Sequence, residues 1–117
     1  MARKISGGKY KKAKKKRLAE MPGHPRAVKL AQEKKKHLRI TGGKIKTVLL
    51  AADKASVLNP LTKKAKVVKI KSIVENPSNR FLRNVLVKGT IIQTELGKAR
   101  ITNRPGQEGC IQAVLIS

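Results

Sequence analysis

The sequence predicts an all-β body, a small barrel-like or curled antiparallel sheet, that follows a basic and irregular N-terminal extension. Short apolar runs recur at roughly ten-residue intervals through the second half of the chain, separated by Gly, Pro and Asn, which is typical of small barrels. Aromatic residues make up 2% of the chain, so a core has to be built from Val, Ile, Leu and Ala. The first 39 residues hold 15 of the 29 basic residues and two of the six acidic ones. We therefore divide the 117-residue chain into an extension, residues 1–39, and a body, residues 40–117.

The extension begins with a stretch of low complexity, residues 1–23, in which Gly7 and Gly8 precede a lysine-rich run over residues 9–17. A segment of this charge repels itself and cannot bury enough apolar surface to offset its ordering entropy. We therefore expect it to stay open until a polyanion binds. Pro25 and the helix-forming residues behind it favour a short helix over residues 25–36, with an extended bound tail as the alternative.

Six runs of the body are expected to form strands. The clearest is the run over residues 66–74, because its β-branched residues are interspersed with lysines that would point outward. The first run alternates polar and apolar side chains over residues 44–48 and continues as a more buried run to residue 52. In chain order the expected strands cover residues 44–52, 66–74, 85–88, 90–94, 98–102 and 111–116.

Turn signals separate these runs: Gly42-Gly43, Asn59-Pro60, Asn76-Pro77, Gly89, Gly97 and residues 104–109. In the last of them, Pro105 and Gly106 suit the central pair of a type II turn, in which Gly106 would take a positive φ. Residues 78–83 are expected to form one helical turn, and Phe81 within it is expected to close the small core.

The charge indicates the class of ligand. A formal net charge of +23 and a pI of about 11.1 are typical of proteins that bind phosphate-rich polymers, and they exclude most globular enzymes as analogues. Lysines outnumber arginines by 21 to eight, which favours neutralisation of phosphates over bidentate reading of bases. Two aromatic residues are too few for a stacking platform on single strands. We therefore expect a folded RNA with closely spaced phosphates as the ligand.

The basic residues allow two other interpretations. A nuclear-localisation signal would account for the lysine-rich run, but not for basic residues that also lie on the expected strands. A DNA-compacting protein is an alternative from a different class, and it would bind duplex DNA and RNA with comparable affinity at matched salt.

The residues do not indicate catalysis, a metal site or a cofactor. His24 and His37 lie in the extension without Cys or carboxylate at metal-ligand spacing, and the six acidic residues form no close pair for acid–base chemistry. The single cysteine, Cys110, cannot form an intramolecular disulfide and is expected to be a small buried hydrophobic residue. Because the sequence has neither an apolar run of about 18 residues nor a secretory signal, we expect a soluble, intracellular protein without a membrane or small-molecule partner.

Five segments together carry a resemblance to one family. Residues 38–44 are similar to a basic segment that enters that family's first strand, and residues 6–9 to a motif near its start. Residues 74–80, followed by residues 85–92, are similar to the family's Glu-Asn-Pro turn and the strand that follows it. Residues 94–109 are similar to the archaeal form throughout. The chain therefore resembles the S8e family of small-subunit ribosomal proteins of archaea and eukaryotes, over nearly its whole length.

This resemblance implies a structural constituent of the small ribosomal subunit, cytoplasmic and not an enzyme, whose partners are small-subunit rRNA and neighbouring ribosomal proteins. It also implies a barrel-like body and an rRNA-bound extension. A ribosome-assembly factor with the same domain is the alternative. Among the expected rRNA-binding residues, those of the extension are Lys9, Tyr10, Lys11, Lys12, Lys14, Lys15, Lys16 and Arg17, with Tyr10 available to stack on one exposed base. The others are Arg39, Lys44, Lys46, Arg80, Arg83, Lys98, Arg100 and Arg104.

Overall fold

The computed structural model of the chain describes residues 2–11, 14–77 and 84–116. Strands are the main secondary structure of these residues, and their only helical elements are two short 3-10 turns, η1 (Leu18–Glu20) and η2 (Thr41–Gly43). No helix in these ranges is long and apolar enough to cross a membrane. The strands are β1 (Lys29–Leu30), β2 (Lys34–Arg39), β3 (Ile45–Ala52), β4 (Lys54–Asn59), β5 (Lys64–Glu75), β6 (Ile91–Thr94), β7 (Gly97–Ile101) and β8 (Gln112–Leu115).

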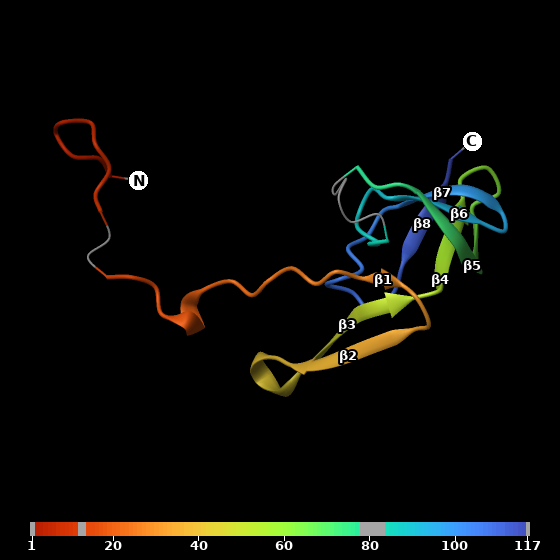
Figure 1. Cartoon of the computed structure of the whole chain (residues 1–117), viewed down its shortest axis with the longest axis horizontal. Helices are drawn as coiled ribbons and strands as arrows, with labels where there is room; N and C mark the ends of the chain where they lie inside the picture. The colour runs from red at the N-terminus through yellow and green to blue at the C-terminus, as the bar shows by residue number, and fades with distance from the viewer. Residues whose placement is uncertain (1, 12–13, 78–83, 117) are drawn as a thin grey trace.

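Strands β4 to β8 form a closed barrel, so the expected all-β, barrel-like body is confirmed (Figure 1). Each strand pairs antiparallel with the next one along the chain. The closing pair, β4 with β8, is parallel, with Val57 opposite Ala113. Five strands that alternate in direction leave the first and last running the same way, so a barrel of this order can close only through one parallel pair. Closure removes the exposed strand edges on which proteins aggregate.

Alternation along the strands builds the barrel core. In β5, Val68 and Ile70 are buried, whereas Lys69 and Lys71 are exposed, because successive side chains of a strand point to opposite faces. In β7, Ala99 and Ile101 are likewise buried, whereas Lys98 and Arg100 are exposed. The core is thus aliphatic, as the composition requires.

A second sheet of order β1-β3-β2 leads into the barrel, because β3 is followed directly by β4. Strands β2 and β3 form an antiparallel hairpin that projects from the body in Figure 1. At its tip Gly42 and Gly43 have φ values of 76° and 72°, a left-handed conformation that glycine adopts without steric cost. The turn expected at these two glycines is confirmed.

The expected helix over residues 25–36 is wrong. Leu30 lies in β1, and Lys34 to Lys36 lie in β2. The backbone of Val28 accepts a hydrogen bond from the Leu86 amide at 2.8 Å, and the Val28 side chain is fully buried. An isolated helix of this length is only marginally stable in water, so strand pairing and burial outweigh helix propensity here. Residues 28–39 thus contact the body, while the division of the chain at residue 39 stays a prediction.

The strand expectations in the body are confirmed except at two places. Residues 85–88 do not form a strand, since only Val85 makes an isolated bridge, to Lys29, and the chain then turns at Gly89, whose φ is 88°. Strand β4 is not among the expected strands, because its short sequence holds just two buried side chains, Ala55 and Val57. The helical turn expected over residues 78–83, with Phe81, lies outside the described residues.

Two residues of the β7–β8 loop also differ from expectation. Gly106 lies in a turn closed by a hydrogen bond from the Gln107 amide to the Arg104 carbonyl, but its φ is not positive, so the type II turn is wrong. Instead, a Cβ at Gly106 would lie 3.1 Å from the carbonyl oxygen of Arg26, tighter than most real contacts, so the loop and the Arg26 backbone approach each other closely here. Cys110 is exposed rather than buried, because the loop turns its side chain away from the core.

The first part of the chain runs away from the body as an open extension (Figure 1). The described residues before Val28 are all exposed, and their local structure amounts to η1 and one bridge between Arg3 and Lys9. The radius of gyration is 19.1 Å, against about 13 Å for a compact chain of roughly this length. The barrel core therefore contains none of the described residues before Val28.

Candidate nucleic-acid interface

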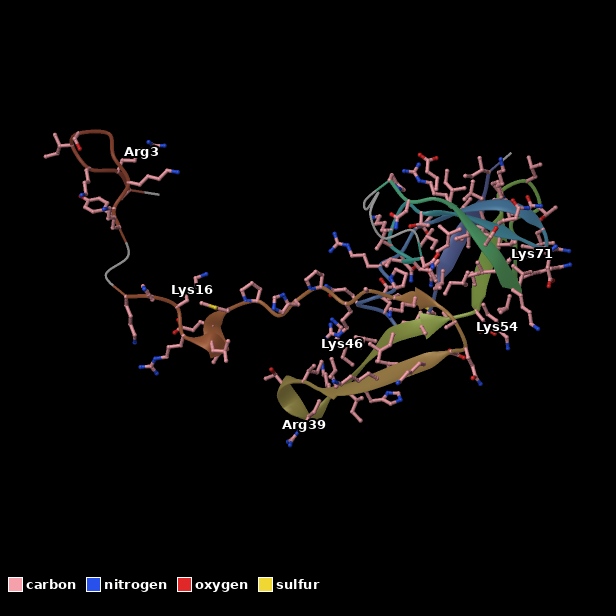
Figure 2. All side chains as sticks on the ribbon, viewed as in Figure 1. Arg3, Lys16, Arg39, Lys46, Lys54 and Lys71 are labelled. Atoms are coloured by element: carbon pink, nitrogen blue, oxygen red, sulfur yellow. The ribbon has the colours of Figure 1, made fainter. Side chains whose placement is uncertain are left out.

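The extension carries the first group of expected contact residues. Lys9, Lys11, Lys14 to Lys16 and Arg17 are all exposed, and Lys12 lies outside the described residues. Tyr10 is 64% exposed, and the Lys4 ammonium lies 5.8 Å from the centre of its ring. Figure 2 shows Arg3 and Lys16 well away from the barrel. These cations are available along a narrow stretch of chain, which can follow an irregular groove between phosphates.

The β2–β3 hairpin carries a second group. Arg39 ends β2 and Lys44 follows η2, so the two cations flank the glycine turn at the hairpin tip, and both are exposed. Lys34, Lys35 and Lys36 are exposed along β2. These three lysines are adjacent in the sequence, but pairing with β3 is what holds them in an extended row.

The part of β3 nearest the hairpin tip and the β7–β8 loop help to line a groove of about 560 Å³. It brings together two expected residues, Lys46 and Arg104, with two that the sequence did not single out, Arg26 and Lys88. We call it the basic groove; its lining consists of residues 23–26, Lys46, residues 86–88 and residues 104–107. Lys46 is half-buried, and its ammonium donates a hydrogen bond of 3.2 Å to the Gln107 side-chain oxygen. Figure 2 shows Lys46 close to where the extension reaches the body.

Hydrogen bonds from one side chain hold the β7–β8 loop that carries Arg104. The Asn103 amide nitrogen donates to the Cys110 carbonyl at 2.8 Å and to Glu108 at 2.9 Å. Its amide oxygen accepts from the Gln112 backbone at 3.0 Å. Pro105, next to Arg104, is fully buried. Arg104 is thus displayed from a loop that is fixed on both sides.

The outer face of the barrel carries a third group. Lys98 and Arg100 point outward from β7, as expected. Lys54 of β4 lies directly opposite Lys69 of β5, and Lys71 is exposed further along the same strand. Lys54, Lys69 and Lys71 were not among the expected contact residues, although the sequence pattern predicts outward lysines on β5. Arg80 and Arg83 lie outside the described residues.

These basic groups are left largely unneutralised by the protein itself. The chain has 29 basic and six acidic residues, and the described part contains one ion pair, between Lys35 and Glu33. The same part contains no cluster of three His, Cys, Asp or Glu residues that could hold a metal ion. The described surface is therefore suited to a polyanion and offers no visible centre for metal chemistry.

The chain is similar to known proteins over nearly its whole length. The profile of the family described as ribosomal protein S8e matches residues 1–116. A small ribosomal subunit protein eS8 from Sulfolobus acidocaldarius is 46% identical over 118 aligned residues, which cover 98% of this chain and 92% of the relative. Relatives of the same name from Methanocella arvoryzae and Methanosphaerula palustris are 44% and 45% identical, over 98% and 97% of this chain and 94% and 93% of their own lengths.

Proposed function

Because the chain belongs to the ribosomal protein S8e family, we propose that it is a structural constituent of the small ribosomal subunit that binds folded rRNA by neutralising phosphates. The family consists of ribosomal proteins and not of enzymes. The partners are small-subunit rRNA and neighbouring ribosomal proteins, and the place of action is the ribosome in the cytoplasm.

The observation that carries this proposal is the placement of unneutralised cations on three different parts of one molecule. They lie on the open extension, on the β2–β3 hairpin and on the outer face of the barrel. Each phosphate that a Lys or Arg neutralises releases a condensed counterion, which favours binding most strongly where phosphates are crowded. Folded rRNA has such crowded phosphates on several sides of a bound protein.

The two parts of the chain have different roles in this proposal. The barrel is a closed, rigid body, so its cations can dock on an RNA surface with little loss of conformational entropy. None of the described residues before Val28 is buried, so in this proposal RNA supplies the contacts that order the extension. We infer that the extension threads between RNA segments whose phosphates would otherwise repel each other.

Removal of residues 1–23 tests the proposal. The truncated chain keeps Val28 and every strand, so its barrel melts as in the full chain, as circular dichroism will show. The removed segment holds nine basic residues. Binding to small-subunit rRNA is expected to weaken, and the slope of log K against log salt to fall by about 0.7–0.9 for each phosphate that is no longer neutralised. An unchanged slope would contradict the role of the extension.

Two further measurements separate the alternatives. A structural constituent co-sediments with mature small subunits at near-equal stoichiometry in high salt, whereas an assembly factor is absent from them. A DNA-compacting protein binds duplex DNA as tightly as rRNA at matched salt. We expect near-equal stoichiometry and a preference for rRNA.

A further inference from the structure

We propose that the basic groove receives one unpaired nucleotide of the bound RNA, with its phosphate on the cations and its base against an arginine side chain. This inference rests on the proposed rRNA binding and makes it specific. A site of about 560 Å³ lies within the range of pockets that take small ligands, about 300–1,000 Å³.

The lining of the groove offers both kinds of contact that a nucleotide makes, charge for its phosphate and a flat surface for its base. Lys46 and Lys88 supply ammonium groups, which suit phosphate as point charges, while Arg26 and Arg104 supply planar guanidinium groups. Unstacked RNA bases pack on arginine planes as well as on aromatic rings. Pro25 and Val87 add apolar surface to the lining. The scarcity of aromatic residues therefore does not prevent the chain from holding one base.

The groove carries no acidic side chain among the described residues that line it. Glu108 follows the loop segment that lines it, but its carboxylate accepts a hydrogen bond from Asn103 and is not part of the lining. An anion that enters the groove thus meets four cations and no lining carboxylate, which favours phosphate over a neutral ligand.

The walls of the groove are fixed before any ligand binds. Lys46 donates a hydrogen bond to the Gln107 side chain, and this contact joins the hairpin to the β7–β8 loop. The Val87 amide donates to the hydroxyl of the fully buried Thr90 at 3.2 Å, which fixes the opposite wall. The Arg26 backbone lies close to Gly106, since a Cβ there would be 3.1 Å from the Arg26 carbonyl oxygen, so the extension packs on the β7–β8 loop at this point. A preorganised site loses little entropy on binding, so even a single nucleotide can contribute to affinity.

Charge-conserving variants of the full chain test the role of the base. Arg26→Lys with Arg104→Lys keeps the net charge but removes the guanidinium planes. If a base stacks in the groove, this double variant binds small-subunit rRNA roughly tenfold more weakly, with an unchanged salt slope. Arg100→Lys, on the exposed face of β7, makes the same change outside the groove and is the control; its ammonium group still neutralises phosphate, so it is expected to lose less affinity than the double variant. The Arg26 and Arg104 side chains are exposed, so the double variant is expected to melt at the same temperature as the unmodified chain.

Wild-type affinity of the double variant would overturn the inference, while strong and salt-dependent rRNA binding by the unmodified chain would still support the proposed function. A second measurement uses the isotope-labelled full chain and nuclear magnetic resonance. Adenosine 5′-monophosphate is expected to shift the amide signals of Val87, Gly106 and Gln107 at lower concentration than inorganic phosphate at matched ionic strength. Equal effects of the two probes, or no shift with either, would contradict a base in the groove.

Discussion

Lys54 and Lys69 lie directly opposite each other on the antiparallel strands β4 and β5, both exposed to solvent. In the described part of the chain neither forms an ion pair with a carboxylate. Like charges that face each other across two strands destabilise the sheet. The free protein thus keeps a repulsive pair on its barrel, and phosphate between the two ammonium groups would relieve it. Figure 2 shows Lys54 at one end of the barrel and Lys71 further along β5.

Lys54→Glu is expected to change stability and binding in opposite directions. The new carboxylate faces Lys69, so the free energy of unfolding rises by about 0.2–1 kcal/mol in a denaturant titration. Binding to rRNA weakens, because one cation is replaced by an anion. The control is Lys64→Glu on β5, which changes the net charge equally but lies opposite the neutral Asn59. A control that gains as much stability as Lys54→Glu would show that the cross-strand pair is not the cause.

Val28→Ala is expected to destabilise the barrel although the residue belongs to the basic first part of the chain. The Val28 side chain is fully buried in the core cluster, so its truncation lowers the free energy of unfolding by about 2 kcal/mol. Val67→Ala removes the same atoms from a side chain that is 70% exposed, and little loss is expected there. Equal unfolding free energies of the two variants would mean that the extension does not pack on the body at Val28.

Gly109→Ala probes the contact between the β7–β8 loop and the hairpin. A Cβ at position 109 would lie 2.9 Å from the Thr47 methyl carbon, closer than real contacts allow. We expect a loss of about 1–3 kcal/mol of unfolding free energy from this overpacking.

Thr47→Ser supplies the second half of that experiment. It removes the methyl group that the new Cβ would meet, yet keeps a hydroxyl for the hydrogen bond of 2.9 Å between the Thr47 hydroxyl and His37 Nδ1. In a double-mutant cycle the serine is expected to recover part of the loss caused by Gly109→Ala. Strict additivity of the two changes would show that the loop does not press on Thr47.

Removal of both cations at the hairpin tip, Arg39→Gln with Lys44→Gln, is expected to lower the salt slope of rRNA binding by up to about 1.4–1.8. Both side chains are exposed, so the unfolding free energy stays within about 0.5 kcal/mol of the unmodified chain. Thr41→Gln alters the same tip without a change of charge and serves as the control. An unchanged salt slope would show that the hairpin tip does not contact the rRNA.

Local patterns in the sequence were sufficient to predict the barrel and its outward cations. The alternation of Val68 and Ile70 with Lys69 and Lys71 depends on the two-residue period of a strand, which holds wherever that strand pairs. The glycines at the hairpin tip were recognisable for a similar reason, because a left-handed backbone favours glycine whatever surrounds it. The predicted rRNA contacts themselves stay predictions.

Other features depend on partners that are distant in the chain. Residues 25–36 favour a helix when they are considered alone, but burial of Val28 and the pairing of Lys34 to Lys36 with β3 place them in the sheet. Gly106 is constrained by the Arg26 carbonyl and not by its own φ. Neither effect leaves a local signal in the sequence.

The excess of positive charge is determined by the sequence alone, because net charge does not depend on how the chain folds, and this charge favours a polyanionic ligand. The same is true of the aliphatic barrel core, which follows from composition and alternation. Only the tertiary structure decided that Arg26, Lys46, Lys88 and Arg104 line one groove, since they come from four separate segments of the chain. Residues so far apart meet only when the strands between them pair and the barrel closes.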